Sequence, residues 1–367
     1  MTNPRRAGRR VLTVTSLVVI AAGAVAATLA GAGPAAAARV TATCANNNGD
    51  AAVIQAAIDG SAAGDEIVID GPCTIVSTVI LRGNRAYRGD SPSTLLREGN
   101  GSNLAAVLAS DSWINNDAFA GEPISLRGLT IDANAANNPT GGDAVVIRSW
   151  RSTVEGLNIR NARAHGLRVT NTSRNGTTLT NTMVNGSIRG LFVENSGQHG
   201  IYVQDTGNSV TDWNLTESWV AASGGDAIKL DNSAGWTVER NHVYGVGGSG
   251  INASRLFATS VSDNYVEDFV TNGIGVTVQG DAASTVVGNR VFQFSGAGTT
   301  YLAIKQVNYG TGHVAVTGNV VRGNGSGVGL SYQRGGNQLT VVSSGNAVSG
   351  VTSPLLFGTG VNVSAGL

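Results

Sequence analysis

The stretch Val238-Glu-Arg-Asn241-His-Val243 contains a pattern that returns along the chain. It returns as Val261-Ser-Asp-Asn264-Tyr-Val266, Val286-Val-Gly-Asn289-Arg-Val291 and Val316-Thr-Gly-Asn319-Val-Val321. Four more asparagines extend the series, with 23 to 33 residues between successive members: Asn158, Asn181, Asn214 and Asn346. A repeat of this length, made of short β-branched runs and small turn residues, predicts a β-solenoid. We expect these asparagines to form an internal ladder, and any chemistry to come from an outer face.

The composition narrows the class of protein further. The chain has 367 residues, 51 of them glycine, with 13% charged residues and a formal net charge of zero. The low charge and the periodic Val and Ile favour packed strands over a disordered chain. A net charge of zero gives no general reason to expect a nucleic-acid partner, and we expect none.

The first 38 residues are typical of an export signal and not of the fold. Four arginines within residues 5–10 precede an apolar stretch from Val11 to about Leu29, and small residues follow up to Ala38. This order predicts a secretory signal peptide, cleaved after Ala38, and therefore a secreted protein with no membrane association after cleavage. A membrane anchor is the alternative. The arginine pair does not decide between general and twin-arginine export.

Residues 39–367 are expected to form a single domain, with a cap region over 39–80. A capped amphipathic helix is predicted over 46–59, with Asp50 as the N-cap. Val53, Ile54, Ala57 and Ile58 would form its apolar face. Short strands are predicted over 65–70, 73–76 and 78–81. The two cysteines, Cys44 and Cys73, lie in this region, and export predicts a disulfide between them.

From residue 142 onward, the first strand of each coil can be aligned by sequence, over 143–148, 165–170, 199–204, 226–231, 249–254 and 272–277. Alternation within each strand places every second side chain outward. One outward row is then Val146, Arg168, Tyr202, Lys229, Asn252 and Gly275. A second is Arg148, Thr170, Gln204, Asp231, Ser254 and Thr277. His165, His199 and Asp226 fall at the turn that enters this sheet.

The helix followed by three-strand coils with an asparagine turn resembles the right-handed parallel β-helix of the pectate lyase superfamily. The segment from Asp50 to Pro72 resembles the cap of that superfamily. The resemblance covers nearly all of the chain after the signal and implies an all-β fold with a short capping helix. It implies a carbohydrate-active protein and a polysaccharide or oligosaccharide partner. The superfamily includes polysaccharide lyases, galacturonan hydrolases, uronan epimerases, inulin fructotransferases and phage tailspikes, so the fold alone does not choose the reaction.

A polysaccharide lyase is the favoured interpretation, because only two lysines occur in the chain and Lys229 is one of them. β-Elimination needs a base beside a carboxylate, a cation for the enolate charge and an acid for the leaving oxygen. Lys229 would be the base, Arg168 and Arg255 the cations and Tyr202 the acid, with His199 beside them. Lys229 with Arg255 one coil further on resembles the Lys/Arg arrangement of alginate- and chondroitin-type β-helix lyases. Epimerisation shares the first step of this reaction.

A glycoside hydrolase or an intramolecular fructosyl transferase is the alternative, and it needs paired carboxylates. Asp226 and Asp231 would be that pair, with Asp205 and Glu217 as further candidates. Asp226-Ala-Ile-Lys resembles the Asp-Asp-Ala-Ile segment of galacturonan hydrolases, although the Gly-His-Gly of that family is absent. A non-catalytic glycan-binding or surface-structural solenoid is the third interpretation.

Three weaker expectations complete the sequence analysis. No cofactor is firmly implied, but Asp263, Glu267 and Asp268 are candidates for a Ca²⁺ site, against the simpler interpretation of a solvated turn. Trp213, Trp219 and Trp236 either stack on sugar rings or are buried. The sequence neither requires nor forbids a homo-oligomer.

Overall fold

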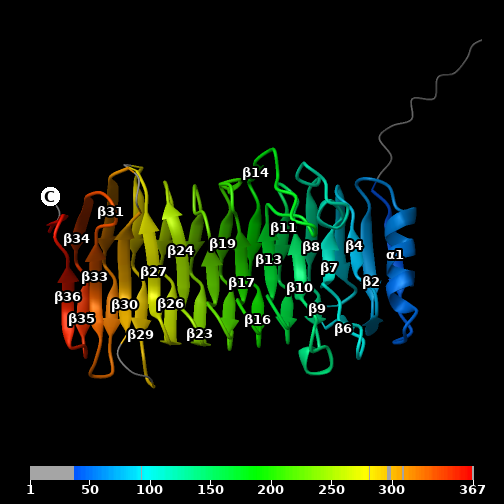
Figure 1. The fold of residues 1–367 in the computed structure, drawn as a ribbon. Helices are drawn as coiled ribbons and strands as arrows, with labels where there is room; N and C mark the ends of the chain where they lie inside the picture. Colours follow the sequence, from blue (N-terminus) through cyan, green and yellow to red (C-terminus); the bar gives the residue numbers. More distant parts are fainter. Residues whose placement is uncertain (1–36, 92, 281, 296–298, 308–309, 366–367) are drawn as a thin grey trace, which may run out of the picture. The chain divides into compact units, whose positions relative to one another are not determined.

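The structure is a computed structural model that describes residues 37–91, 93–280, 282–295, 299–307 and 310–365. The expected signal peptide over 1–38 lies almost wholly outside the described residues. The described chain coils repeatedly into three long parallel sheets, named here sheets A, B and C (Figure 1). The expected all-β parallel β-helix is therefore confirmed. No helix among the described residues is both long and apolar enough to cross a membrane.

Sheet A has 13 strands. In spatial order they are β1 (Arg39–Thr43), β2 (Glu66–Asp70), β5 (Arg85–Gly89), β8 (Ile124–Arg127), β11 (Thr153–Glu155), β15 (Ser187–Arg189), β19 (Asn214–Thr216), β22 (Thr237–Glu239), β25 (Ser260–Ser262), β28 (Ser284–Val287), β31 (Gly312–Thr317), β34 (Leu339–Ser344) and β37 (Val361–Ser364).

Sheet B has 11 strands and follows sheet A within each coil. Its strands are β3 (Cys73–Ile75), β6 (Leu95–Glu98), β9 (Thr130–Asp132), β12 (Asn158–Arg160), β16 (Phe192–Glu194), β20 (Trp219–Ala221), β23 (His242–Val246), β26 (Tyr265–Phe269), β29 (Arg290–Phe292), β32 (Val320–Arg322) and β35 (Ala347–Ser349).

Sheet C also has 11 strands and corresponds to the strands aligned by sequence. They are β4 (Val79–Leu81), β7 (Ala106–Ser110), β10 (Asp143–Ile147), β13 (Leu167–Thr170), β17 (Ile201–Gln204), β21 (Ile228–Leu230), β24 (Ile251–Leu256), β27 (Asn272–Val278), β30 (Thr300–Gln306), β33 (Val328–Gln333) and β36 (Ser353–Phe357). A separate two-stranded sheet pairs β14 (Met183–Val184) with β18 (Val210–Thr211).

The core is a stack of equivalent side chains along the inside of the coils. Because the pairing is parallel and in register, a residue that points inward in one coil lies above its equivalent in the next. Three such stacks are fully buried and consist mostly of β-branched residues: Val238, Val261 and Val286 from sheet A, Val243, Val266 and Val291 from sheet B, and Ile228, Ile251 and Ile274 from sheet C. The hydrophobic core therefore runs the length of the described chain.

Five of the eight recurring asparagines form the expected ladder at the turn from sheet A to sheet B. Each side-chain oxygen accepts from the amide of the preceding member, as Asn264 Oδ1 does from Asn241 Nδ2 at 3.0 Å and Asn289 Oδ1 does from Asn264 Nδ2 at 3.0 Å. Each Nδ2 also donates to a backbone carbonyl of sheet A, such as that of Val238 at 3.0 Å. Asn319 and Asn346 continue the ladder in the same way.

The other three asparagines do not belong to the ladder, which corrects the expectation for them. Asn158 and Asn214 lie within strands β12 and β19, and Asn181 accepts a hydrogen bond from the backbone of Ala120. In the earlier coils the turn position holds other residues, namely Leu129, Leu157, Leu191 and Ser218, all of them buried. The preceding residue has a positive φ in each case, from Gly128 to Gly345, which is why glycine recurs there.

The N-terminal end of the solenoid is closed by α1 (Asp50–Gly60), which contacts β1, β3 and β4. The disulfide between Cys44 and Cys73 is present and ties the segment before α1 to sheet B. Two details of the expected helix are wrong. Gly49 is the N-cap, while the carboxylate of Asp50 accepts from the backbone of Ala45, Asn47 and Thr74; and Val53 is 44% exposed.

Candidate functional site

The first outward row is confirmed residue by residue. Parallel pairing in sheet C aligns Val146, Arg168, Tyr202, Lys229, Asn252 and Gly275. In the second row, Thr170 pairs with Gln204, and Asp231 follows directly after the end of β21. The register shifts in β24 between Ala253 and Leu256. Within that shift the backbone N–H of Arg255 donates to Thr277 Oγ1 at 2.7 Å.

Two insertions cover the outer face of sheet C at its N-terminal end, which the sequence analysis did not expect. One contains α2 (Asp111–Ile114), and its Trp113 packs with Val146, Ala106 and Ala109 in a separate apolar cluster. The other, over 171–184, is bonded to the first, as by Arg174 N to the Trp113 carbonyl at 3.1 Å. Arg148 is fully buried beneath them and donates to backbone carbonyls of both insertions, so it is not a surface residue.

Beside these insertions, Tyr202, Asp231 and Lys229 form a connected polar group on the exposed part of sheet C. The Tyr202 hydroxyl donates to Asp231 Oδ2 at 2.8 Å. Lys229 Nζ lies 3.9 Å from Asp231 Oδ1 and 5.2 Å from the centre of the Tyr202 ring. The Lys229 and Asp231 side chains are 30% and 27% exposed. Burial, together with the hydrogen bond to Asp231, raises the pKa of Tyr202, so its hydroxyl stays protonated at neutral pH.

His165 and His199 stack beside this group on adjacent coils. Their rings are 5.2 Å apart with an interplanar angle of 6°, and the Tyr202 ring is 4.7 Å from His165 and 5.1 Å from His199. His165 Nδ1 accepts from the His199 backbone N–H at 3.2 Å, and His199 Nδ1 accepts from that of Asp226 at 2.9 Å. Because each Nδ1 is an acceptor, these hydrogen bonds assign the ring proton to Nε2.

Both imidazoles are held in the neutral form. Burial, together with the neighbouring His199, Arg168 and Lys229, lowers the pKa of His165 to about 3. Burial also lowers the pKa of His199, with Lys229 acting in the same direction and Asp226 opposing it. Two neutral rings with Nε2–H donors are therefore fixed next to Tyr202, and they can donate hydrogen bonds but are not free bases.

Arg168 is anchored between the insertions and the polar group. Its Nε lies 2.8 Å from Asp143 Oδ2, its guanidinium is 5.3 Å from the centre of the Trp113 ring, and Nη1 donates to Gln204 at 3.3 Å. Burial raises the pKa of Asp143 although Arg168 opposes the shift. Sequence analysis missed Asp143 as a partner of Arg168, although it precedes His165 in the same row of turn residues.

Three of the acidic candidates, Asp226, Asp205 and Glu217, are each engaged by other partners. Asp226 accepts from the Ser249 backbone N–H at 2.7 Å and from Asn252 Nδ2 at 3.0 Å, so both its oxygens are engaged. Asp205 is buried and accepts from Asn171, Gly207, Ser209 and Val210, which makes it a turn-stabilising carboxylate. Glu217 lies at the turn from sheet A to sheet B and pairs with Arg189 and Arg240. Among the described residues, these contacts engage both carboxylates, and no hydrogen bond or ion pair joins either of them to Asp226 or Asp231.

Arg255 does lie one coil beyond Lys229, on β24, but three positions past Asn252 and within the register shift. Its φ is 59°, and its Nε donates to Gln279 at 3.1 Å on the following coil. This hydrogen bond directs Nε of Arg255 toward the coil on its C-terminal side.

The proposed calcium ligands do not gather. Among the described residues, no group of three or more His, Cys, Asp or Glu side chains is arranged to hold a metal ion. Glu267 contacts His242 at 3.3 Å, and Asp268 accepts from the backbone of Phe294 at 2.8 Å. Of the three tryptophans, Trp213 and Trp236 are buried and donate to backbone carbonyls, whereas Trp219 is 42% exposed on sheet B.

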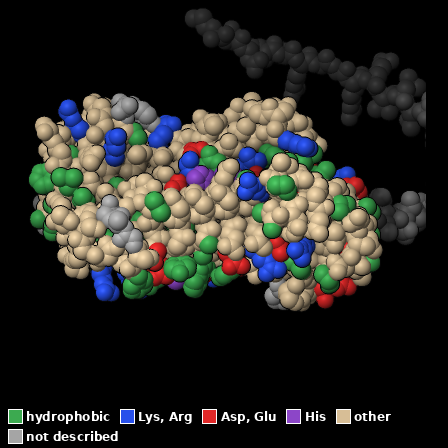
Figure 2. Space-filling view, turned by 60° about the horizontal axis from the view of Figure 1, so that its bottom comes forward, with side chains coloured by type: hydrophobic (Ala, Val, Ile, Leu, Met, Phe, Trp, Pro, Cys, Tyr) green, Lys and Arg blue, Asp and Glu red, His purple; other side chains and the backbone are tan. Residues whose placement is uncertain are grey.

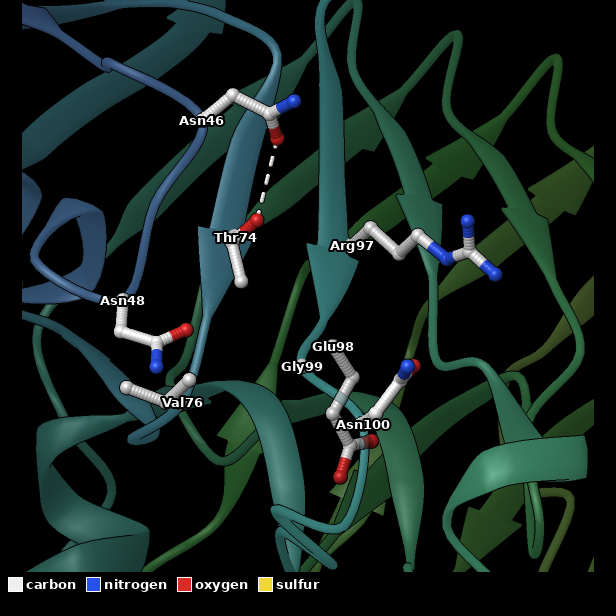
Figure 3. Close-up of a pocket in the computed structure, with 8 residues that line it drawn as sticks. All are labelled: Asn46, Asn48, Thr74, Val76, Arg97, Glu98, Gly99 and Asn100. Carbon is white, nitrogen blue, oxygen red and sulfur yellow. Dashed lines mark hydrogen bonds between the residues drawn. The ribbon is translucent and has the colours of Figure 1, made fainter.

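A cavity of about 420 Å³ lies elsewhere, at the N-terminal end of the solenoid (Figure 3). Glu98 lines it together with polar residues that include Asn46, Thr74 and Asn100. Burial raises the pKa of Glu98 to about 7, and its carboxylate accepts from the Leu104 backbone at 2.7 Å. This hydrogen bond gives the Glu98 carboxylate a structural role. We therefore place the candidate site at the connected group of Tyr202, Asp231 and Lys229 on sheet C.

On the face shown in Figure 2, the charged side chains form small groups, with histidines among them, on a background of uncharged residues. The group on sheet C fits this description. It contains one lysine, one arginine, two histidines, a tyrosine and three carboxylates: Lys229, Arg168, His165, His199, Tyr202, Asp143, Asp226 and Asp231. Its chemistry is that of proton transfer and of binding an anionic ligand.

Comparison with known proteins was made on sequence and on structure. A search of curated protein sequences gave no match. The A-module of mannuronan C-5 epimerase AlgE4 from Azotobacter vinelandii superposes with a TM-score of 0.62 at 16% identity, covering 89% of this chain and 100% of that one. DFA-IIIase from Arthrobacter chlorophenolicus A6 gives 0.55 at 12% identity, covering 89% and 94%.

A Dettilon tailspike protein, gp208, superposes with a TM-score of 0.56 at 12% identity, covering 84% of this chain and 65% of the tailspike. At these identities the likeness concerns the fold. Residues 199–366 match the family described as the right handed beta helix region. The chain therefore has the fold of a right-handed parallel β-helix, the architecture expected from its resemblance to the pectate lyase superfamily.

Proposed function

We propose that the chain is a secreted carbohydrate-active enzyme that cleaves a uronate-containing polysaccharide by β-elimination on sheet C. The connected group of Tyr202, Asp231 and Lys229 on an exposed sheet face carries this proposal. The names of the structural neighbours, an epimerase of mannuronan and a tailspike among them, support a polysaccharide substrate. Export is proposed from the leader sequence, and the disulfide between Cys44 and Cys73 fits an oxidising compartment.

The substrate carboxylate binds among the donors that border the group. Arg168 supplies a cation, and His165 and His199 supply neutral Nε2–H donors. These donors stabilise the negative charge that develops on the carboxylate when the neighbouring carbon loses its proton. The buried ion pair of Arg168 with Asp143 fixes the cationic edge of the same surface.

The proton balance uses the contacts within the group. Lys229 passes a proton to Asp231 and, as the neutral amine, removes the proton from the carbon next to the carboxylate. Tyr202, which its raised pKa keeps protonated, gives its hydroxyl proton to the leaving glycosidic oxygen. The Asp231 proton then returns to Tyr202 along their 2.8 Å hydrogen bond, which leaves Lys229 protonated and the group as it began.

Hydrolysis by paired carboxylates receives less support from the same contacts. The Asp226 carboxylate accepts hydrogen bonds from Ser249 and Asn252. The Asp143 carboxylate contacts His165 and Arg168. Asp231 is thus the carboxylate that contacts Tyr202 and Lys229, whereas hydrolysis needs two. Epimerisation differs from elimination only in the return of a proton to the same carbon. The neighbour with a TM-score of 0.62 is an epimerase, and this favours epimerisation as the second candidate.

Lys229→Ala tests the proposal, with Lys305→Ala as the matched control. Lys305 is the other lysine of the chain and is also exposed on sheet C, in β30. The wild type is incubated with a panel of polyuronates, neutral glycans and fructans, while ultraviolet absorbance and new reducing ends are recorded together. We expect unsaturated uronate products that Lys229→Ala reduces by roughly a hundredfold or more and that Lys305→Ala preserves.

The other outcomes separate the candidates. A change in uronate stereochemistry by NMR, with neither absorbance nor chain cleavage, would replace elimination by epimerisation. Reducing ends without absorbance, in a reaction that survives Lys229→Ala but not Asp231→Asn, would overturn the lyase proposal in favour of a carboxylate-based hydrolase.

A further inference from the structure

The outer face of sheet B carries a continuous row of exposed and half-buried aromatic side chains. The aromatic row consists of Phe192, Trp219, His242, Tyr265, Phe292 and Phe294. Successive ring centres are 4.1 to 6.0 Å apart, and Phe192, Trp219 and Phe294 are 38%, 42% and 64% exposed. Large exposed apolar patches are uncommon on soluble proteins and often mark a binding surface.

Register alone places four of these rings in line. Phe192, Trp219, His242, Tyr265 and Arg290 are paired in one row across five consecutive strands, β16 to β29. Four steps of the usual strand spacing make the row roughly 19 Å long. A straight row of this length, with a ring in each of its first four coils and Arg290 in the fifth, suits an extended polymer that offers a similar contact at each unit.

The C-terminal end of the aromatic row is cationic. Arg290 lies 5.2 Å from the centre of the Tyr265 ring, and Arg322 follows Phe292 on the next strand. Both arginines, with Tyr265, Phe292 and Phe294, line a cavity of about 330 Å³. Within the described residues neither guanidinium forms an ion pair, and no carboxylate lines this cavity. Two arginines without acidic partners beside stacked rings are complementary to a ligand that is both flat-faced and anionic.

We propose that the aromatic row with Arg290 and Arg322 is a second binding site, for a chain of carboxylated sugars. The C–H face of a pyranose ring packs on an aromatic ring, and a guanidinium pairs with a carboxylate through two parallel hydrogen bonds. A neutral glycan would use only the rings, and an apolar protein surface would leave the arginines unpaired. The site lies on a different sheet from Lys229, and only the identity of its ligand with the substrate rests on the proposed function.

Binding is measured by titration calorimetry in the Lys229→Ala background, so that the ligand is not consumed. The probes are oligogalacturonate and oligomannuronate, with a neutral gluco-oligosaccharide of the same length. Two double variants remove the two halves of the site: Arg290→Ala with Arg322→Ala, and Trp219→Ala with Phe294→Ala. Each is matched by a control of similar character, Arg151→Ala and Phe257→Ala, because Phe257 is 46% exposed and Arg151 stacks on Trp150.

We expect the anionic oligomers to bind, and each double variant to weaken binding by roughly tenfold or more while the controls bind as the parent. Removing the arginines should also abolish the preference over the neutral oligomer. Thermal melts of every variant establish that it is folded. Equal binding by the double variants and the controls would overturn the proposal. The proposal would also be overturned if Trp219→Ala with Phe294→Ala did no more than convert a dimer to a monomer in sedimentation runs. The occupant of the aromatic row would then be a second copy of the chain.

The two proposals fail separately in this design. Loss of the proposed function would appear as a wild type without turnover on any polyuronate, while calorimetry would still report the arginine-dependent site. Loss of the second site would appear as unchanged calorimetry in the double variants, while wild-type turnover and its dependence on Lys229 would remain.

Discussion

The amide of Asn264 is bonded on both sides of its coil. Its oxygen accepts from the backbone and side chain of Asn241, and its Nδ2 donates to Asn289 and to the Val238 carbonyl. We expect Asn264→Ala to lower the free energy of unfolding by about 3 kcal/mol, since it leaves several buried polar groups without partners. Denaturant melts test this, with Asn214→Ala as the control, because Asn214 is exposed in β19. Equal losses in both variants would contradict the ladder as a source of stability.

His165 makes stability depend on pH in a defined direction. Its folded pKa of about 3 lies below the ordinary value of 6.5, so protonation favours the unfolded chain. The contribution of the neutral His165 imidazole to the free energy of unfolding is complete above pH 6.5 and is lost as the pH falls toward 3. Between pH 6.5 and pH 5 we expect the wild type to lose about 2 kcal/mol more than His165→Gln. Parallel unfolding curves at several pH values measure the difference, and identical slopes would refute a neutral buried imidazole.

At the residue scale, sequence alone located Tyr202, Lys229, Asp231 and the histidines, because strict alternation fixes which side chains face outward. The sequence-based prediction failed for some of the recurring asparagines, because the same residue type occurs at different structural positions. Asn158 and Asn214 continue the asparagine spacing but lie within strands, and the turn position of their coils holds Leu157 and Ser218. The spacing of one residue type cannot show which position of the turn it occupies.

At the scale of elements, the N-terminal cap formed by α1 depends on the disulfide between Cys44 and Cys73. The disulfide joins residues 29 positions apart on either side of α1, and the helix packs against β1, β2, β3 and β4. We expect Cys44→Ser with Cys73→Ser to lower stability by about 3 kcal/mol, because the unfolded chain regains the freedom of that loop. Hydrogen exchange should show faster opening in 44–81 than in the strands around Lys229. Uniform acceleration throughout the solenoid would argue that the cap and coils unfold as one unit.

The elements that sequence did not predict are the two insertions over sheet C. Residues 111–121 and 171–184 lack any repeat, and their bonds join segments about sixty positions apart, such as Ala120 with Asn181. Their effect is large, since they bury Arg148 and Val146, which alternation alone places outward. Alternation gives the direction of a side chain, but only tertiary contacts decide whether that direction leads to solvent.

At the scale of the whole molecule, the two ends of the solenoid differ. α1 covers the first coil, whereas the inward row Ile274, Leu302, Leu330 and Leu355 ends in a leucine that is 40% exposed. We expect the wild type to self-associate at high concentration through this end, as open sheet edges do. Leu355→Lys should keep the protein monomeric in sedimentation velocity runs. Association that persists in Leu355→Lys but is lost in Trp219→Ala would instead assign the contact to sheet B.

The parallel register common to all three sheets also fixes distances along the molecule in steps of one coil. Every coil adds one strand to sheet C and one to sheet B, so the offset between Lys229 and the arginines at the end of the aromatic row is a whole number of coils. Inserting or removing a complete coil between them would change that offset by about 4.8 Å without altering either surface. A polymer held at both places would be cut at a length set by counting turns of the chain.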